Sequence, residues 1–339
     1  MININSDQYH RLSLSPLCEH SWDNNIEPLV SICSITYNHG PYIKECLEGF
    51  LMQKTTFPVE ILIHDDASTD GTEEIIREYE VKYPHIIKPL YEDENQWAKG
   101  KKGSKVFNFP RARGKYIALC EGDDYWTDPL KLQKQVEFLE GNEEYGLVYT
   151  DVDKLNQETG SIVTNFLSTN DYSFCKSNKD YLIYAPFRAP CTWLFRKRLL
   201  QPSLKNYVVG DLPLFLDILL VSKVHQLPDI TAVYRVLENS ASHFSDLQKE
   251  YVFMQGIFDI QMDYALKFNV DEELINLIQK KFAKQSYYYA VALNDKKQII
   301  SADKLLKTDK ELSRNFKLVQ LLAKCKFGRF IVKLKIKKT

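Results

Sequence analysis

Residues 114–129 read GKYIALCEGDDYWTDP. The apolar run Tyr116–Cys120 is short and well bounded, which predicts a buried strand. Asp123 and Asp124 follow it, so we expect them at the strand's carboxyl end, where open α/β sheets bind their ligands. Adjacent carboxylates suit a hard divalent cation that shares its oxygen ligands with substrate phosphates. The same letters are also good turn chemistry, so the pair alone does not decide between a turn and a metal site.

The composition is that of a globular protein. The chain has 339 residues, of which 44% are hydrophobic and 26% charged, and this length suits one large or two ordinary domains. The formal net charge is −1, so no overall basic field would recruit nucleic acid. The seven cysteines form no Cys-x-x-Cys pair, which predicts reduced, buried thiols in a cytosolic compartment.

Both ends of the chain bear on localisation. Residues 1–27 are a polar leader without the charged-then-apolar plan of a signal peptide, and no apolar run approaches the roughly 18–20 residues of a membrane span. Residues 321–339 mix apolar side chains with seven Lys or Arg and no Asp or Glu. Such a segment can lie on anionic lipid, pack as a basic helix on the protein, or fray. We expect a cytoplasmic protein, with this end as a candidate peripheral contact at the inner face of the cell membrane.

Two further predicted strands end in polar residues. Residues 29–36 lead into Tyr37 and Asn38, and residues 59–64 lead into the pair Asp65-Asp66. Strands that alternate with amphipathic helices predict a mainly parallel sheet. The other predicted strands are 86–91, 146–150, 162–166, 191–196 and 230–236, and the predicted helices are 41–53, 72–82, 128–139 and 211–220.

The pattern changes along the chain. The connection 92–113 is polar and carries several Lys and Arg, so it is either a cover for a diphosphate or a solvated loop. After residue 245 every periodic segment is helical. We therefore expect a leader over 1–27, an α/β domain over 28–245 and a helical region with a basic amphipathic end over 246–339.

Three strings at these spacings resemble the family 2 glycosyltransferases of the GT-A fold, over about residues 28–245. They are Val30-Ser31-Ile32 through Thr36-Tyr37-Asn38, Asp65-Asp66-Ala67-Ser68-Thr69-Asp70-Gly71-Thr72, and Gly114 through Asp124. The resemblance implies a Rossmann-like mixed, mainly parallel sheet flanked by helices, with a helical C-terminal region. It also implies an inverting, metal-dependent hexosyltransferase that uses a nucleotide-sugar, with UDP-sugar as the expected donor. The expected acceptor is a hydroxyl of a glycan or lipid-linked glycan, in surface polysaccharide biosynthesis.

The resemblance assigns roles to the polar strand ends. The nucleotide would be held by Thr36, Asn38, Asp66 and Asp123, and Asp124 would bind Mn²⁺ or Mg²⁺ on the diphosphate. A carboxylate also suits uracil, because it can accept a hydrogen bond from the ring N–H of the base.

The acceptor side of the expected site comes from later in the chain. Asp211 heads an apolar helix and would act as the general base, although an Asp in this place is also a good N-cap. Arg235 is expected over the phosphates. His243 is a candidate further metal ligand, or a surface histidine.

Two other readings of the sequence stay open. A nucleotidyltransferase on a similar sheet would need a Gly-rich basic loop directly after the first strand, and residues 36–40 are a poor candidate for one. A catalytically silent nucleotide-sugar-binding scaffold would need none of the carboxylates that are present. A dehydrogenase is disfavoured because no Gly-x-Gly-x-x-Gly follows the first strand.

Overall fold

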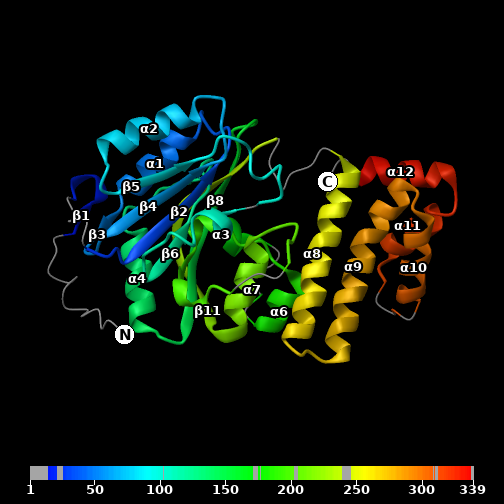
Figure 1. Ribbon diagram of the computed structural model, residues 1–339. Helices are drawn as coiled ribbons and strands as arrows, with labels where there is room; N and C mark the ends of the chain where they lie inside the picture. The colour runs from blue at the N-terminus through cyan, green and yellow to red at the C-terminus, as the bar shows by residue number, and fades with distance from the viewer. Residues whose placement is uncertain are drawn as a thin grey trace. The chain divides into compact units, whose positions relative to one another are not determined.

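The computed structural model divides into two compact units (Figure 1). It describes residues 14–20, 26–101, 103–170, 175, 177–201, 205–238, 246–307, 309 and 312–336. The first unit comprises Met1–Phe174, Phe187–Leu204 and Pro213–Val236, and the second comprises Cys175–Pro186, Lys205–Leu212 and Leu237–Thr339.

The first unit is built on a nine-stranded mixed sheet. Across the sheet the order is β5 (Ile87–Tyr91), β4 (Val59–Asp65), β2 (Val30–Thr36), β6 (Tyr116–Leu119), β10 (Leu194–Arg196), β8 (Tyr145–Asn156), β11 (Lys223–Val236) and β7 (Tyr125–Trp126), with β9 (Ile162–Val163) on β8. β5, β4, β2 and β6 pair in parallel, β10 is antiparallel to both β6 and β8, and β8 and β11 are parallel. Only β7, β9 and β10 run against the others, which confirms the mixed, mainly parallel sheet.

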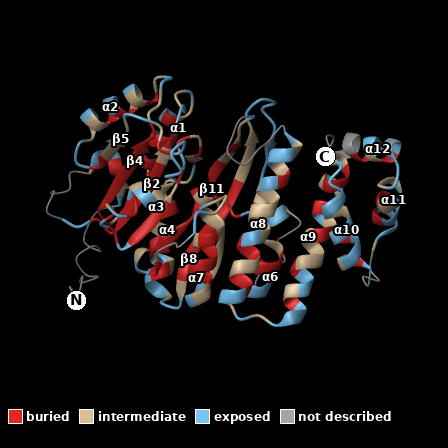
Figure 2. Ribbon diagram, turned by 45° about the vertical axis from the view of Figure 1, so that its right-hand side comes forward, coloured by how far each residue is buried: buried red, intermediate tan, exposed pale blue. Residues whose placement is uncertain are grey.

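Helices cover the sheet, and the central strands are therefore almost completely buried. All seven residues of β4 are buried, as are six of the seven in β2, and Figure 2 shows this buried core along β2 and β4. Parallel strands covered on both faces are expected to be continuous apolar runs rather than alternating ones. The unit's helices and minor elements are α1 (Ile43–Leu51), α2 (Thr72–Lys82), α3 (Ser104–Phe107), α4 (Lys131–Gly141), α5 (Phe166–Thr169), α7 (Asp211–Val221, from Pro213 on), β1 (Ser15–Pro16), β3 (Lys54–Thr55), and the 3₁₀ turns Leu17–Glu19, Pro190–Thr192 and Lys197–Leu199.

The chain reverses its direction of travel across the sheet between β2 and β6. From β2 the chain moves outward through β4 to β5, and it then returns to place β6 on the other side of β2. Such a switch point leaves a crevice beyond the carboxyl ends of the two central strands. The polar strand ends named above lie on β4, β2 and β6, which are the strands that border this point.

The second unit is helical. Its helices are α6 (Asn178–Tyr184), α8 (Leu247–Lys267), α9 (Glu272–Leu293), α10 (Lys296–Leu306), α11 (Arg314–Leu322) and α12 (Lys326–Ile336). Five of them begin directly after a residue whose side chain accepts backbone N–H groups of the first turn, namely Ser177, Asp246, Asp271, Asp295 and Ser313. Such caps supply partners for N–H groups that a helix leaves unpaired. Within the described part of the chain, no helix is both long and apolar enough to cross a membrane.

Local details differ from the sequence predictions. The helix predicted over 128–139 begins at Lys131, because the Asp128 carboxylate accepts the N–H of Leu130 at 2.8 Å in a turn that precedes it. The prediction that all cysteines are buried is wrong for two of them. All seven are free, but Cys18 and Cys325 are exposed.

Candidate active site

The ends of β4 and β6 are both tied by main-chain hydrogen bonds to the end of β2. The N–H of Asp66 donates to the Thr36 carbonyl at 3.0 Å, and the N–H of Gly122 donates to the Ile35 carbonyl at 2.9 Å. These bonds bring the Asp65-Asp66 and Asp123-Asp124 strings to one edge of the sheet, on either side of Thr36.

Gly122 allows this close approach. A Cβ at this position would stand 2.6 Å from Oγ1 of Thr36 and 3.1 Å from Nδ1 of His39. Both of those atoms are buried, and neither forms a hydrogen bond with any residue in the described ranges. Buried polar atoms in proteins nearly always have a partner. The nucleotide contact that the sequence predicts for Thr36 stays a prediction, and its hydroxyl has a free hydrogen-bonding capacity among the described residues.

Asn38 organises the turn after β2. Its backbone is left-handed, with φ of 54°, a conformation that Asn tolerates better than most residues. Its side-chain Oδ1 accepts the N–H of Thr69 at 2.8 Å, and its own N–H donates to Oγ of Ser68 at 2.8 Å. Ser68 is held in turn by Asp65, whose Oδ1 accepts the serine hydroxyl at 2.6 Å. Asn38 itself is exposed. The turn that it stabilises follows β2 directly, at the edge of the sheet where the carboxylates lie.

Asp66 is buried and holds the following loop. Its Oδ1 accepts the N–H of Gln96 at 2.7 Å and its Oδ2 accepts the N–H of Trp97 at 3.1 Å. An ionised carboxylate has about four acceptor sites, so these two bonds leave capacity for a donor on a ligand. Trp97 remains 43% exposed and stands next to this carboxylate. Sequence reasoning missed both loop residues because their N–H groups bind through the backbone, which no side-chain pattern reveals.

Asp124 lies deeper than Asp123. It is 4% exposed, and its Oδ1 accepts the backbone N–H of Arg235 at 2.8 Å. Burial, together with the neighbouring Asp123 carboxylate, raises the pKa of Asp124, while hydrogen bonds from Arg235 and Cys191 act against that rise. Asp123 is more accessible, and its Oδ2 lies 3.9 Å from Nε2 of His39.

The Arg235 side chain is enclosed. Its guanidinium lies 5.0 Å from the ring centre of Tyr42 and 4.7 Å from that of Tyr125. One nitrogen donates to Oε1 of Gln157 at 2.7 Å, and another pairs with the Glu45 carboxylate. Glu45 is itself 59% exposed. A role for this guanidinium at the phosphates would thus require the Glu45 pair to open.

The carboxylates fit a hard cation that is shared with a ligand. Two adjacent carboxylates stand at a strand end, one of them buried without a cationic side chain on its oxygens. Among the described residues no group of three or more His, Cys, Asp or Glu could hold a metal by itself. Mg²⁺ usually takes one or two carboxylates and completes its shell with phosphate and water, so Asp123 and Asp124 suit a cation held together with a diphosphate.

The acceptor side of the predicted site comprises Asp211 and His243. Asp211 is the first residue of α7 and belongs to the second unit, whereas the rest of that helix from Pro213 belongs to the first. Asp211 is partly buried, and burial raises its pKa. His243 lies outside the described residues.

The arginines of the 92–113 connection support the sheet. The Arg111 guanidinium donates to the carbonyls of Lys88 and Ile63, both at 2.8 Å, and Arg113 pairs with Glu60 at 3.1 Å. These contacts hold β4, β5 and the connection together, so the two side chains have partners within the protein.

His64, the residue before the first Asp pair, contacts two residues of the same 92–113 connection. Its ring stacks on Phe107 with centroids 3.8 Å apart, and its Nε2 lies 3.5 Å from Glu92. Burial lowers the pKa of His64. The histidine therefore packs α3 against β4.

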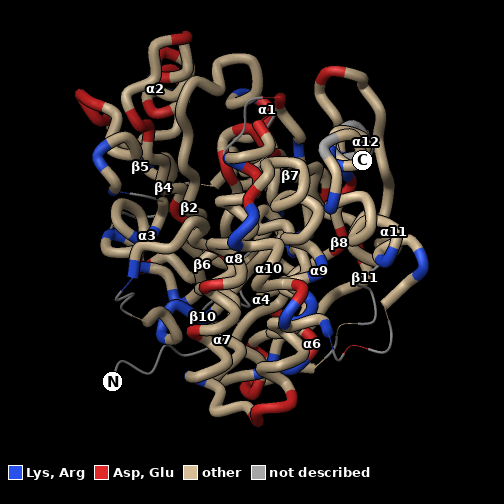
Figure 3. Tube along the Cα trace, turned by 90° about the vertical axis from the view of Figure 1, so that its right-hand side faces the viewer, with Lys and Arg blue, Asp and Glu red and all other residues tan. Residues whose placement is uncertain are grey.

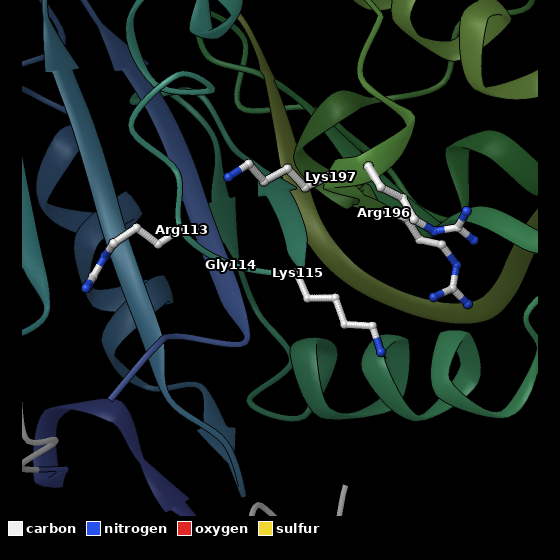
Figure 4. Close-up of a pocket in the computed structure, with 6 residues that line it drawn as sticks. Arg113, Gly114, Lys115, Arg196 and Lys197 are labelled. Atoms are coloured by element: carbon white, nitrogen blue, oxygen red, sulfur yellow. The ribbon is translucent and has the colours of Figure 1, made fainter. Parts of the chain in front are cut away.

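A basic concavity of about 390 Å³ lies elsewhere, at the start of β6. Figure 4 shows that the side chains of Arg113 and Lys115 leave the backbone in different directions, as do those of Arg196 and Lys197. Lys115 pairs with Glu140 at 2.6 Å, and Arg196 donates to several backbone carbonyls. Because β6 ends at the acidic motif, this concavity is at the opposite edge of the sheet.

The fold and the strand-end carboxylates define the GT-A class of glycosyltransferase. The family model described as "Glycosyl transferase family 2" matches residues 31–203. The chain belongs to glycosyl transferase family 2.

Several relatives are similar to part of the chain. The uncharacterized protein Mb1547 of Mycobacterium bovis is 38% identical over 213 residues, which are 61% of this chain and 58% of that protein. The UDP-Glc:alpha-D-GlcNAc-diphosphoundecaprenol beta-1,3-glucosyltransferase WfaP of Escherichia coli is 37% identical over 112 residues, which are 33% of this chain and 41% of that protein. The chain thus spans less than two thirds of the length of these curated relatives.

Solved structures share the fold over nearly the whole chain. S. aureus TarS 1-349 in complex with UDP-GlcNAc has a TM-score of 0.60 at 18% identity and covers 91% of both chains. The mannosyltransferase PcManGT from Pyrobaculum calidifontis, in complex with GDP-Man and Mn²⁺, has a TM-score of 0.54 at 14% identity and covers 97% of this chain and 92% of that one.

Proposed function

We propose that this protein transfers a sugar, with inversion, from a nucleotide-sugar to a hydroxyl of a glycan or lipid-linked glycan. One observation carries the proposal. The main-chain bonds of Asp66 and Gly122 to the last residues of β2 bring two carboxylate strings together at the switch point of the sheet. A nucleoside diphosphate has a base with N–H donors and a charged diphosphate, and the two strings offer acceptors for the first and cation-binding oxygens for the second.

The donor side of the reaction follows from the contacts of Asp66. Its carboxylate is fixed by the N–H groups of Gln96 and Trp97, so it is oriented before any ligand arrives. A fixed acceptor favours a base with a ring N–H, and uracil has one. TarS is seen with UDP-GlcNAc and PcManGT with GDP-Man, and we propose a UDP-sugar as the donor here. Trp97, whose N–H binds Asp66 and which is 43% exposed, is proposed as a contact for the base.

Asp123 and Asp124 are proposed to hold the diphosphate through Mn²⁺ or Mg²⁺. When bound, such a cation stabilises the negative charge that develops on the departing nucleoside diphosphate. The residues of the chain orient this site. The N–H of Arg235 holds Oδ1 of Asp124, and the remaining acceptor sites of Asp124, together with the more accessible Asp123, are proposed for the cation.

Asp211 is proposed as the general base. It would accept the proton of the acceptor hydroxyl as that oxygen attacks the anomeric carbon, in a single displacement that inverts the configuration. Burial raises the pKa of Asp211, and a raised pKa makes a carboxylate a stronger base near neutral pH.

The acceptor is proposed to belong to surface polysaccharide synthesis. WfaP is named for transfer to a diphosphoundecaprenol-linked sugar, and a lipid-linked acceptor of that kind would bring this enzyme to the inner face of the cell membrane. Residues 321–339 are the proposed contact.

Calorimetry with UDP, GDP, CDP and ADP, each with and without Mn²⁺, tests the proposal. We expect UDP to bind more tightly than the other three, and only in the presence of the cation. Asp123→Asn should weaken this binding strongly, whereas Asp93→Asn, a change at an exposed carboxylate on the Asp66 loop, should leave it intact. Equal binding of UDP without metal, or no binding of any diphosphate, would contradict the proposal.

A further inference from the structure

The helix α12 leaves large apolar side chains in solvent. Phe327 is 73% exposed, Phe330 57% and Ile331 40%, and the three fall within little more than one helical turn. Spacings of three and four residues put side chains on one face of a helix. Single exposed apolar residues are common on protein surfaces, but an adjoining group of this kind marks an interaction site.

The packing of the second unit fixes which face is exposed. Val332 is buried in a hydrophobic cluster with Tyr287, Phe316 and Val319, so α12 is anchored by a different side. At the start of the helix, a Cβ on Gly328 would stand 2.2 Å from the Leu322 carbonyl oxygen, which means that α11 and α12 meet too closely for a side chain there. The phenylalanines are exposed because Val332 and Gly328 occupy the inner side.

The charged residues of the segment that carries this face have one sign. Residues 312–339 contain no Asp or Glu. Arg314, Lys317 and Lys324 are exposed, and none of them forms an ion pair with a residue that the structure describes. Elsewhere the surface differs. In Figure 3 the tube of α2 is marked by acidic residues.

We propose that the α12 face of Phe327, Phe330 and Ile331 docks into the headgroup region of an anionic lipid bilayer. Apolar side chains would enter the boundary between headgroups and acyl chains, while the lysines and arginines contact lipid phosphates, which is how amphipathic basic helices lie in a membrane interface. The charge favours this partner, because residues 312–339 carry Lys and Arg and no Asp or Glu, and such a segment complements a negative surface. The inference concerns the second unit alone and does not depend on the proposed reaction.

Sedimentation of the full chain with vesicles tests the docking. We expect binding to phosphatidylcholine vesicles that contain phosphatidylglycerol, little binding to phosphatidylcholine alone, and a loss of binding as salt rises. Phe327→Ser with Phe330→Ser should lower the partition coefficient at least tenfold. Lys317→Gln with Lys324→Gln should lower it by about fivefold per cation at low salt.

Matched controls separate docking from folding. Leu266→Ser with Ile300→Ser changes two apolar residues that are 72% and 68% exposed on α8 and α10, and Lys296→Gln with Lys297→Gln removes two exposed cations from α10. Both controls should bind vesicles like the parent protein, and all four variants should keep its thermal unfolding temperature. Because UDP binding is measured separately, a failure here leaves the proposed reaction standing, and the reverse also holds.

Two outcomes would overturn the inference. One is undiminished vesicle binding by the double phenylalanine variant. The other is a parent protein that light scattering shows to be a dimer without lipid, that becomes a monomer in this variant, and that binds no vesicles. That second result would make a second copy of the chain the partner of α12.

Discussion

The backbone N–H of Arg235 donates a 2.8 Å hydrogen bond to Oδ1 of Asp124, between residues 111 positions apart in the sequence. The bond joins β11 to the acidic motif, and the Arg235 side chain then continues to Glu45 on α1. The buried carboxylate therefore has its orientation set by the main chain of a neighbouring strand. A group fixed in this way needs little reorganisation when a cation and a diphosphate arrive.

Asp124→Asn should abolish transfer without unfolding the protein. The amide oxygen of Asn can still accept the Arg235 N–H, and the neutral amide avoids burying a charge beside Asp123. The loss of a cation ligand should lower the rate of sugar transfer by about 100-fold or more. Initial rates with a UDP-sugar and a thermal melt of the same sample measure both effects. A variant with near-parental activity would remove Asp124 from the metal site.

Gly122→Ala should destabilise the fold, by about 1–3 kcal/mol, the usual range for forcing a methyl group into a packed site. The added Cβ would meet Oγ1 of Thr36 at 2.6 Å, and Thr36 is fixed in the central strand. Chemical denaturation gives the free energy of unfolding of the variant and of the parent.

Gly141→Ala is the control for that experiment. A Cβ at Gly141 would meet nothing within 4 Å, and Ala is the better residue in a helix. This variant should equal or exceed the parent in stability. If both alanine variants are equally stable, the close contact between the acidic motif and β2 is not what requires Gly122.

The strand ends could be predicted from sequence because their signals are local. An apolar run followed by polar residues is enough to place Thr36, Asp66 and Asp124 at one edge of a parallel sheet. The partners of these groups could not be predicted in the same way. Arg235 holds Asp124 through its backbone N–H. Every residue other than proline has a backbone N–H, so the sequence does not indicate which residue makes this bond.

The position of the antiparallel strand β10 in the middle of the sheet could not be predicted from local sequence patterns either. Leu194–Arg196 has the strand-like composition that the sequence predicted, but its place between β6 and β8 depends on pairings across long separations. The two-residue strand β7 is part of the acidic motif and was not predicted as a strand. It pairs with β11, which explains why Trp126 is buried.

Asp66→Asn should loosen the loop that Asp66 holds. An amide has one acceptor oxygen in place of two, so either the Gln96 or the Trp97 N–H loses its partner, at a cost of about 1–3 kcal/mol to the local structure. Hydrogen exchange at these two amides should become faster, and UDP affinity should fall. Asp93→Asn on the same loop should change neither. Unchanged exchange at both amides would contradict the anchoring role.

Lys131 should make stability depend on pH. It is fully buried, with its ammonium 4.3 Å from the Trp126 ring centre, and burial lowers its pKa to about 7. The unfolded chain binds this proton up to the ordinary lysine pKa of about 10.4. Between these two values the unfolded state carries more protons than the folded one, so stability should rise with pH from about 7 upward. Melting curves across this range should show the rise in the parent and a flatter profile in Lys131→Met.

Asp211→Asn should separate activity from stability. A general base must be ionised, so the rate of transfer should fall as pH drops through the raised pKa of Asp211, at a pH above the ordinary aspartate value of about 4. Replacing the base should lower the rate by ~10²–10⁴-fold and leave UDP affinity unchanged, because the carboxylate serves the acceptor.

The stability of the same variant should move in the opposite direction. A carboxyl group whose pKa is raised on folding adds stability at low pH and loses that contribution as pH rises through its folded-state value. At neutral pH the ionised, partly buried Asp211 therefore opposes folding, and the neutral amide should melt at a higher temperature than the parent, with the difference vanishing in acid. An Asp that serves only to start α7 would give the reverse, since the loss of a negative charge at a helix N-terminus lowers stability. A variant that is less stable at neutral pH and still active would identify Asp211 as a residue that only stabilises the start of α7. Another carboxylate of the chain would then be the general base.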